Sequence, residues 1–331
     1  MGDRKNNSPE EMIQKLLTGD RRAAARLISL VENRSDKAGD LMKLVYPHTG
    51  KAMILGITGA GGSGKSSLIN QLIERFRHKH DKVGVLAVDP SSPFSGGALL
   101  GDRIRFQKHS TDSGVYIRSM GSRGYLGGLA RATTDVVRIM EAMGNDVIII
   151  ETLGVGQDEF DIIHIAQTCL LVLTPGMGDD IQAMKAGIME ISDLIVLNKA
   201  DLDNAEVTLR TLEATLHFLS KKEEGVWSPK VIPTVAVAPR SDEIQGIDDL
   251  VEAVLEHQTY LRNNQRFDEI HAKRIEQELS LIFKDEVEKF VFTGLKGTGK
   301  KREYIEAIMS GRNDPYSVVH EVLKTFLASR E

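Results

Sequence analysis

The sequence has a single cysteine, Cys169, in 331 residues. A disulfide framework within one chain is therefore excluded, and this cysteine content is typical of a reducing compartment. The longest apolar runs, such as residues 147–150 and 170–173, have the length of strands. None approaches the roughly 18 residues that a membrane-spanning helix needs. The first residues lack an apolar signal core and carry acidic groups early, unlike a secretory or transit peptide. We therefore expect a cytoplasmic protein.

The chain also lacks an excess of positive charge. Its net charge is −5 and its pI is about 6.0, whereas a general nucleic-acid binder is usually basic. We expect neither a nucleic-acid nor a membrane partner. Hydrophobic residues make up 41% and charged residues 27% of the chain, which suffices to bury a core and stay soluble. The length suits one large α/β domain with helical additions, or two domains.

Both ends of the chain carry helical patterns. Apolar residues recur at helical spacing over residues 8–33, and Ser8 followed by Pro9 and two glutamates is typical of a helix start. A short helix is expected over residues 40–45. After residue 248 the spacing predicts helices over 248–263, 266–288, 301–310 and 315–329, and a strand is considered only at 290–292.

Short apolar runs alternate with helical stretches between these ends. The predicted strands are residues 52–57, 83–88, 115–117, 146–150, 169–174, 194–197 and 231–234. Such alternation is typical of a mostly parallel sheet with helices on both faces. We predict an α/β fold with a helical N-terminal extension (residues 1–47), a central domain (48–263) and a helical C-terminal extension (264–331).

The first predicted strand leads into a phosphate-binding loop. Residues 59–66 fit the pattern G-x-x-x-x-G-K-[ST] between a strand and a helix, which predicts a P-loop NTPase. Glycines let successive backbone N–H groups point at phosphate oxygens, and the following helix N-terminus adds its positive dipole end. Lys65 can reach the β- and γ-phosphates, and Ser66 can offer its hydroxyl to Mg²⁺. An accidental glycine-rich turn is the alternative. The predicted nucleotide-binding residues here are Gly59, Ala60, Gly61, Gly62, Ser63, Gly64, Lys65, Ser66 and Ser67.

A second match to this spacing lies at residues 294–301, but Lys301 stands where Ser or Thr is required. It follows a long charged helical stretch with at most a brief strand. We predict a basic loop there and no second nucleotide site.

The strand at 194–197 ends in Asn198-Lys199-Ala200-Asp201, a guanine-reading pattern. The Asp201 carboxylate can accept hydrogen bonds from N1–H and N2–H of guanine, a donor pair that adenine lacks. Asn198 would brace the loop and bond the purine, and the Lys199 stem would pack on the base. The pattern lies at the carboxyl edge of a strand, where such sheets bind ligands. A solvated turn with Asp201 as a helix cap is the alternative. A small-residue stretch after strand 231–234 is expected to lie against the base: Val235, Ala236 and Val237.

Acidic residues after two further strands are candidate Mg²⁺ contacts. Glu151 and Gly154 stand in the place of the D-x-x-G switch, and the longer glutamate side chain suggests a contact through water. Asp89 and Asp102 follow strand 83–88, which we expect to neighbour the phosphate loop; a turn or a cap is the alternative for each aspartate. The predicted metal residues are Ser66, Asp89, Asp102 and Glu151.

Five longer stretches resemble one family of GTPases. They are VLAVDPSSPFSGGALLGDRIRF, RSMGSRGYLGGLAR, VIIIETLGVGQDE, GDDIQAMKAGIMEISDLIVLNKAD and NDPYS. These are similar to segments of the methylmalonyl-CoA mutase-associated GTPases, also called MeaB-type or ArgK-type proteins and once labelled arginine/ornithine transport kinases. The resemblance implies a homodimeric GTP-hydrolysing chaperone that gates adenosylcobalamin loading of a cobalamin-dependent acyl-CoA mutase and protects that enzyme. The helical ends would serve dimerisation and partner contact.

The resemblance also implies residue roles. It supports the phosphate, metal and guanine assignments made above, and it adds a third switch that couples partner binding to hydrolysis through Asp179, Gln182 and Lys185. The candidate catalytic residues are then Lys65, Lys185, Glu151 and Gln182. The chain departs from the family pattern at Ala186, Tyr125 and Asp158. These departures concern how strongly, and by which mutase, the protein is activated, and they leave nucleotide binding intact.

No glutamine directly follows Gly154, where Ras-like proteins hold the one that orients water; Gln157 lies further on. We therefore expect slow hydrolysis by the isolated protein. A cationic side chain delivered by a switch adds on the order of a thousandfold or more, and Lys185 is the leading candidate, with a solvated helix lysine as the alternative.

Three other functions would each require features that differ from these. A metal-insertion GTPase would need clusters of Cys and His to bind its metal. This chain has one cysteine, and its histidines are scattered. A small-molecule kinase, as the old transport label suggests, would need an acceptor pocket and an aspartate base, and no separate motif indicates either. A non-enzymatic scaffold would not need Lys65, Ser66 and the guanine reader together.

Overall fold

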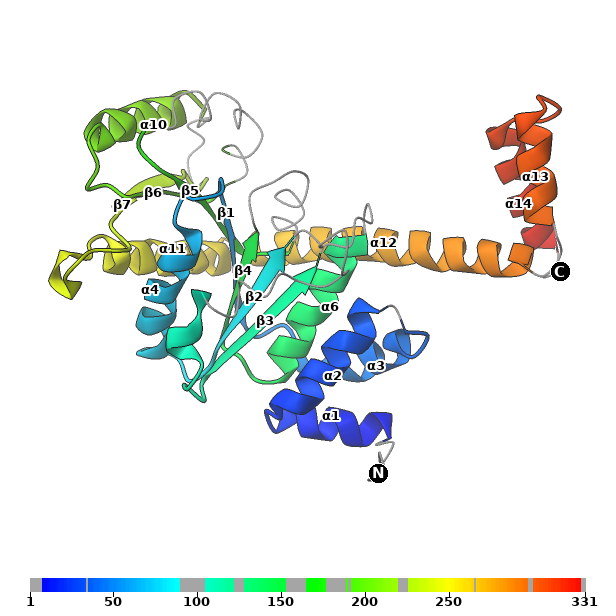
Figure 1. The fold of residues 1–331 in the computed structure, drawn as a ribbon, viewed down its shortest axis with the longest axis horizontal. Coiled ribbons are helices and arrows are strands. Elements are labelled where there is room, and N and C mark those ends of the chain that lie inside the picture. Colours follow the sequence, from blue (N-terminus) through cyan, green and yellow to red (C-terminus); the bar gives the residue numbers. More distant parts are fainter. Residues whose placement is uncertain are drawn as a thin grey trace. The chain divides into compact units, whose positions relative to one another are not determined.

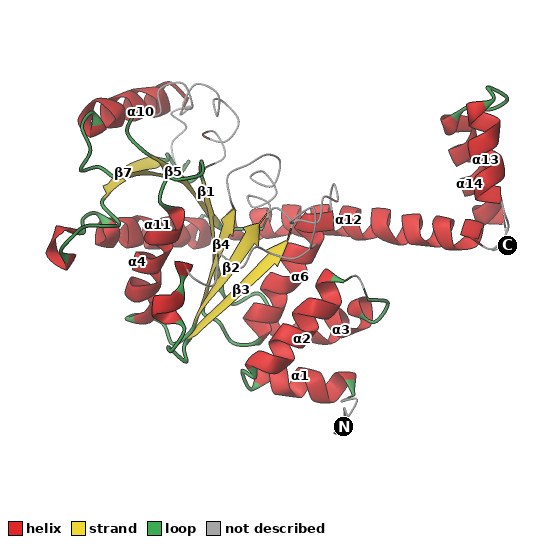
Figure 2. Cartoon of the chain, in the orientation of Figure 1, coloured by secondary structure: helices red, strands yellow, loops and turns green. Residues whose placement is uncertain are grey.

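The computed structural model describes residues 8–33, 35–89, 105–121, 128–152, 165–176, 189, 192–219, 226–264, 266–296 and 300–328. The chain divides into two compact units at the boundary between His271 and Ala272. The first unit contains a sheet with helices on both faces, and the second unit is helical (Figures 1 and 2). Within the described part of the chain, no helix combines the length and the apolar character needed to cross a membrane.

The sheet has seven strands in the order β3-β2-β4-β1-β5-β6-β7, all paired in parallel. Their bounds are β1 (Met53–Thr58), β2 (Val83–Asp89), β3 (Val115–Gly121), β4 (Val147–Thr152), β5 (Thr168–Leu173), β6 (Leu194–Asn198) and β7 (Lys230–Thr234). The predicted α/β fold is confirmed. The expectation that β2 neighbours the phosphate loop is wrong, because β4 lies between β2 and β1.

Helices cover both faces of this sheet. Helices α4 (Lys65–Arg77) and α11 (Ile247–Asn263) pack on one face, and α6 (Gly128–Ala142) and α10 (Ala205–Leu219) on the other (Figure 1). Alternate residues of each strand point to opposite faces, so Leu55 packs in the core beside α4 and Ile54 in the core beside α6. Burying one such side chain contributes about 1.5–3 kcal/mol.

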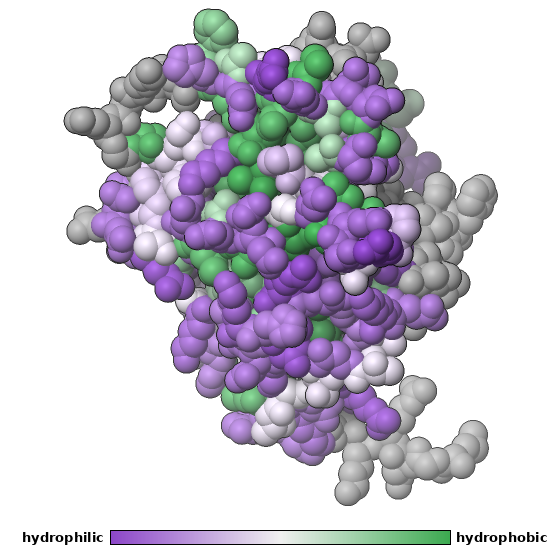
Figure 3. Space-filling model, turned by 90° about the vertical axis from the view of Figure 1, so that its left-hand side faces the viewer, coloured by the Kyte–Doolittle hydropathy of each residue, from purple (hydrophilic) through white to green (hydrophobic). Residues whose placement is uncertain are grey.

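The outer surface of this unit is mixed in polarity. Figure 3 shows hydrophilic side chains over most of the lower part of the face, with hydrophobic ones between them toward the top. On α10, Val207 and Phe218 are 65% and 87% exposed.

The N-terminal segment forms three α-helices that pack against α6: α1 (Pro9–Leu17), α2 (Arg21–Glu32) and α3 (Ala38–Val45). The helical spacing over residues 8–33 is divided between two helices, α1 and α2. Gly19 has a φ of +83°, and the Asp20 side chain accepts hydrogen bonds from the N–H groups of Arg22 and Ala23, which starts a new helix. The predicted start at Ser8 is confirmed, since its hydroxyl accepts the Glu11 N–H at 3.2 Å.

A buried polar network fastens α11 to the sheet. The Thr168 hydroxyl lies 2.8 Å from His257 Nδ1 and accepts a 2.8 Å hydrogen bond from Gln258. His257 Nε2 lies 3.3 Å from the Asp193 carboxylate. Burial lowers the pKa of His257 to about 4, so its ring is neutral at pH 7. Because the Asp193 carboxylate can only accept, Nε2 carries the proton of the neutral ring, and Nδ1 therefore accepts from the Thr168 hydroxyl.

The second unit consists of α13 (Lys300–Met309), α14 (Pro315–Ala328) and the part of α12 (Arg266–Lys296) beyond residue 271. The strand considered at 290–292 is wrong, because these residues lie inside α12.

Candidate nucleotide-binding site

The phosphate loop begins where β1 ends and runs into α4. Gly59 has a φ of +142°, and a Cβ atom there would lie 2.2 Å from the Val172 carbonyl oxygen. Gly64 has a φ of +89°, and its Cβ would lie 2.3 Å from Asn198 Nδ2. Real Cβ atoms do not approach other atoms so closely, and L-residues rarely adopt these φ values. Glycine is therefore required at both positions by the tight packing of the loop.

Lys65 extends back over the loop from the first turn of α4. Its side chain is buried, and its ammonium group donates hydrogen bonds to the carbonyl oxygens of Gly59 at 2.5 Å and Ala60 at 2.9 Å. This places a compact positive charge inside the curled backbone. At the start of α4 the helix dipole adds further positive potential. The geometry suits the predicted contact with phosphate oxygens.

Ser66 faces an acidic residue at the end of a neighbouring strand. Its hydroxyl donates a 2.8 Å hydrogen bond to the carboxylate of Glu151, which is only 2% exposed. The parallel register places Glu151 of β4 opposite Ile57, near the end of β1. Glu151 therefore lies close to the phosphate loop, and its side chain reaches Ser66. Mg²⁺ prefers hydroxyl and carboxylate oxygens of this kind. The donor set therefore fits a magnesium ion, and the hydrogen bond shows that Glu151 reaches the Ser66 hydroxyl directly.

The predicted guanine-reading segment is tied to the phosphate loop. Asn198 is buried at the end of β6, and its Nδ2 donates to the Ser63 carbonyl oxygen at 2.9 Å. Its Oδ1 accepts hydrogen bonds from the Thr234 hydroxyl at 3.2 Å and from the Ala236 N–H at 3.3 Å. One amide thus joins three segments that are distant in sequence. This is the bracing role that the sequence indicated.

Lys199 and Asp201 complete this segment. Lys199 has a φ of +58°, unusual for a residue other than glycine, and such strain at about 1–3 kcal/mol is typical of functional sites. Its ammonium donates to the Gly62 carbonyl oxygen at 2.9 Å, so the side chain extends toward the phosphate loop. Asp201 is exposed and lines an open cavity of about 570 Å³ together with Val235 and Val237. A free carboxylate at the cavity wall is what recognition of guanine requires.

Several predicted residues cannot be placed. Gly154, Asp102, Gln182 and Lys185 lie outside the described residues. The backbone of Asp89 ends β2 at the same edge of the sheet, but its side chain is outside what the structure describes. Among the placed residues, the structure joins the phosphate loop, Glu151, Asn198 and Lys199 into one site at the carboxyl ends of the strands.

Sequence reasoning missed three residues that shape this site. Thr234 is fully buried and bonds Asn198, while Gln245 and Gly246 close the loop that carries Val237. Thr234 ends a predicted strand directly before the small-residue stretch, a signal that could have identified it. Nothing in the local sequence around Gln245 and Gly246 indicates a contact with β7, because that contact is tertiary.

The arrangement can bind a nucleoside triphosphate and hold its terminal phosphate against fixed positive groups. Catalysis of phosphoryl transfer is mostly positioning and charge stabilisation. The loop amides and Lys65 place positive charge in the loop, Ser66 and Glu151 present oxygen atoms of the kind that Mg²⁺ prefers, and Asp201 presents a carboxylate at the cavity wall. This arrangement is compatible with the guanine nucleotide site that the sequence predicts.

Comparison with known proteins shows which ones this chain resembles. A family model described as methylmalonyl Co-A mutase-associated GTPase MeaB matches residues 24–296. A protein of Pyrococcus abyssi that carries a provisional GTPase name is 47% identical over 96% of this chain and 97% of its own length. GTPase ArgK of Escherichia coli is 32% identical over 93% of this chain and 92% of its own length.

A mammalian relative and a solved structure extend the comparison. The methylmalonic aciduria type A homolog of Mus musculus is 34% identical over 78% of this chain and 65% of its own length. The crystal structure of a LAO/AO transport system kinase has a TM-score of 0.69 at 25% identity and covers 98% of this chain and 100% of that chain.

Proposed function

Because the chain belongs to the methylmalonyl-CoA mutase-associated GTPase family, we propose that it hydrolyses GTP as the chaperone of a cobalamin-dependent acyl-CoA mutase. In this role it gates adenosylcobalamin loading and protects the mutase. The observation that carries the GTPase part is the direct coupling of the two halves of the site, since Asn198 of the guanine reader bonds Ser63 of the phosphate loop. The family description and the name of the mouse relative support a methylmalonyl-CoA mutase or a related enzyme as partner.

The chemistry follows from the residues already placed. Backbone amides of residues 59–64 and the Lys65 ammonium bind the β- and γ-phosphates, and Asp201 selects guanine. Ser66 and Glu151 would hold Mg²⁺, which neutralises charge on the phosphates when bound. Asp89 and Asp102 are proposed as further contacts of this metal site.

Partner control of hydrolysis is assigned to the third switch. We expect slow hydrolysis by the isolated protein and acceleration when the mutase engages Gln182 and Lys185. Lys185→Ala should then leave GDP affinity nearly unchanged and intrinsic hydrolysis within a few-fold. The acceleration by the mutase should be largely lost. Full acceleration in the variant, or an equal collapse of its intrinsic rate, would contradict this assignment.

The proposed function is tested with the full-length protein and purified cobalamin-dependent mutases. Phosphate release from GTP is measured alone and with each mutase, with ATP as the competing nucleotide and Lys65→Ala as the inactive control. Acceleration by one mutase supports the proposal. Absence of acceleration and of complex formation with every such mutase would overturn the chaperone role. Phosphate transfer to arginine or ornithine instead of water would favour a small-molecule kinase.

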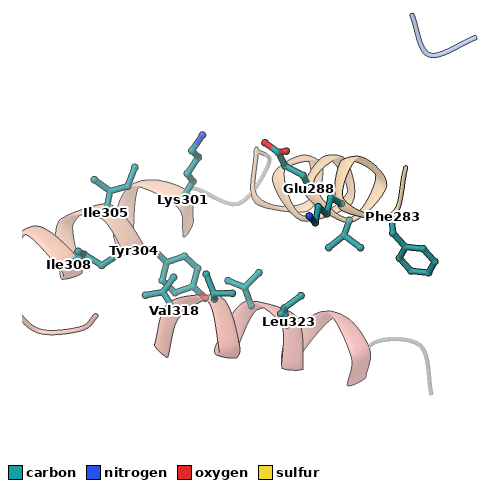
Figure 4. A pocket seen from close by; sticks show the side chains of 12 residues that line it. Phe283, Glu288, Lys301, Tyr304, Ile305, Ile308, Val318 and Leu323 are labelled. Carbon is teal, nitrogen blue, oxygen red and sulfur yellow. The ribbon is translucent and has the colours of Figure 1, made fainter. Parts of the chain in front are cut away.

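The second unit supports a homodimer as the working form. An apolar groove of about 650 Å³ lies among α12, α13 and α14, and its lining includes Phe283, Val287, Ile305, Val319 and Leu323 (Figure 4). Phe283 is 71% and Val319 57% exposed, so these side chains are not simply core. Figure 4 shows Tyr304 of α13 directed toward α14, where its hydroxyl donates to Glu321 at 3.3 Å.

We assign the groove to a second copy of this chain, within the proposed dimerisation extension of residues 264–331. The same helices supply both the groove and protruding apolar side chains, which is what a two-fold interface between identical surfaces requires. Phe283→Asp should shift the full-length protein to a monomer in light scattering. Met309→Asp is the matched control, because Met309 is 83% exposed but does not line the groove. A parent protein that stays monomeric at high concentration would refute the assignment.

A further inference from the structure

The segment after β7 is closed into a short loop by a pair of backbone hydrogen bonds. The Val235 N–H donates to the Gln245 carbonyl oxygen at 3.0 Å, and the Gln245 N–H donates back to Val235 at 3.2 Å. The two residues form an isolated antiparallel bridge outside the named strands. Ala236 and Val237, the residues assigned to the base, lie inside this closed loop. The bridge therefore limits how far they can move.

The residue after the bridge must be glycine. Gly246 has a φ of +71°, and a Cβ atom there would lie 2.0 Å from the Pro233 carbonyl oxygen and 3.2 Å from Thr234 Cα. Both neighbours are backbone atoms of β7, so neither can rotate away. The close approach of the chain to the end of β7 is what brings Gln245 beside Val235. Another residue at position 246 would push these two segments apart.

The bridge is connected to Asp201 through the end of β7. The Ala200 N–H, one residue before Asp201, donates to the Thr234 carbonyl oxygen at 3.0 Å. The Thr234 hydroxyl and the Ala236 N–H both donate to Asn198 Oδ1. Displacement of residues 234–236 would therefore shift the backbone from which the Asp201 carboxylate projects.

The other side of the bridge rests on a fixed helix. Gly246 is the N-cap of α11, whose Ile247, Leu250, Val251 and Val254 are at most 2% exposed. The network around His257 holds the same helix to β5. The loop is thus fixed at one end by α11 and at the other by β7, and the cavity beside it is lined by Asp201, Val237, Gln245 and Gly246 together.

We propose that Gly246 and the Val235–Gln245 bridge are positioning elements for guanine specificity, which hold Ala200 and so direct the Asp201 carboxylate at the amino group of the base. This inference rests on the proposed function, in which Asp201 reads guanine. It adds residues that act through Asp201 and do not touch the nucleotide phosphates. Its consequence is selective, because loosening the bridge should reduce base discrimination more than phosphate binding.

Comparison of GDP with IDP measures this discrimination. Inosine lacks the N2 amino group, so IDP forfeits one of the two hydrogen bonds to Asp201 and keeps every phosphate contact. A hydrogen bond to a charged group is worth on the order of tenfold or more in affinity, and the parent protein should prefer GDP by that order. Loosening the bridge should lower GDP affinity by about tenfold and IDP affinity by no more than about threefold.

Two variants and one control separate this effect from simple instability. Gly246→Ala introduces both the unfavourable φ and the clash with Pro233. Gln245→Pro removes the N–H donated to Val235. Ile244 already has the extended backbone, with φ −71° and ψ 125°, that a residue before proline adopts. Gly50→Ala is the control, because Gly50 has a φ of +88° with no atom within 4 Å of its added Cβ. It introduces the backbone strain without touching the loop.

Titration calorimetry with GDP and IDP is performed on the full-length proteins, with thermal unfolding recorded in parallel. Loss of the GDP preference in both loop variants, with the preference kept in Gly50→Ala, supports the proposal. Folded loop variants that keep the parent preference, or that lose GDP and IDP affinity equally, overturn it. If Gly246→Ala does not fold, the Gln245→Pro result decides. A parent protein with no preference for GDP over IDP would instead overturn the guanine reader itself, and this inference with it.

Discussion

Replacing Asn198 by alanine should weaken nucleotide binding by separating the two halves of the site. The amide makes three hydrogen bonds: to the Ser63 carbonyl oxygen, to the Thr234 hydroxyl and to the Ala236 N–H. Ser63, Thr234 and Ala236 are at most 3% exposed, so water does not readily replace the lost partner. Leaving a buried polar group unpaired costs about 1–3 kcal/mol. For three such groups the combined loss is on the order of 3–9 kcal/mol.

This loss is shared between folding and binding, since the bonds exist before a nucleotide arrives. If half of it appears in binding, GDP affinity falls by about tenfold to a thousandfold. The remainder should lower the midpoint of thermal unfolding by several degrees. Displacement of a fluorescent GDP analogue measures the first quantity, and circular dichroism measures the second on the same preparation.

Asn264→Ala is the matched control for this experiment. Asn264 is also an asparagine whose Nδ2 donates to a carbonyl oxygen, that of Tyr260, but it is exposed at the end of α11. Its replacement should leave GDP affinity unchanged. An Asn198→Ala protein that is folded and binds GDP within threefold of the parent would refute the view that the amide couples the loops.

Three further predictions concern single residues. Lys65→Ala should abolish GTP turnover and weaken triphosphate binding in a phosphate-release assay, because it removes the ammonium held inside the loop; full activity would mean that the nucleotide binds elsewhere. Asp201→Asn should weaken GDP binding and favour XDP in calorimetry, since xanthine offers a carbonyl where guanine has its amino group; tighter binding of ATP than GTP by the parent would contradict this. Burial lowers the pKa of His257 to about 4, from an ordinary value of 6.5. Between these two pH values the unfolded chain binds more protons than the folded protein. The free energy of unfolding should therefore fall by about 3 kcal/mol as the pH drops from 6.5 to about 4. Urea unfolding of the parent and of His257→Gln at pH 7 and pH 4.5 checks this, and an equal loss in both proteins would exclude His257 as the cause.

The sequence was sufficient to predict most of the sheet because the inner strands β1, β4, β5 and β6 are buried along their whole length and therefore appear as continuous apolar runs. The phosphate loop was predicted for a similar reason, since its glycines and Lys65 form one local pattern. The order of the strands in the sheet could not be predicted from local sequence patterns. Whether β2 or β4 lies next to β1 is decided by side-chain packing across the sheet, and no local pattern encodes it.

Helix boundaries show the same division between local and tertiary information. The break between α1 and α2 was missed because the apolar spacing continues across Gly19, whose φ of +83° ends the first helix. At residues 290–292 a strand was considered where the structure has a helix. Two phenylalanines and a valine favour a strand by composition, but they continue the long helix α12, in which neighbouring turns decide the conformation.

Gly64 and Asn198 show why the two nucleotide motifs form a single structural unit. Each motif is short, and the guanine-reading pattern alone is a weak signal. In the folded chain a Cβ atom at position 64 would lie 2.3 Å from Asn198 Nδ2, so the glycine that curls the phosphate loop also makes room for the amide that braces the base reader. The same amide then reaches Thr234 and Ala236 across the adjacent loop. A chain with the N-K-x-D pattern but a larger residue at the position of Gly64 could not seat its asparagine in this way. The presence of both motifs at compatible positions is therefore stronger evidence for a guanine nucleotide site than the two motifs counted separately.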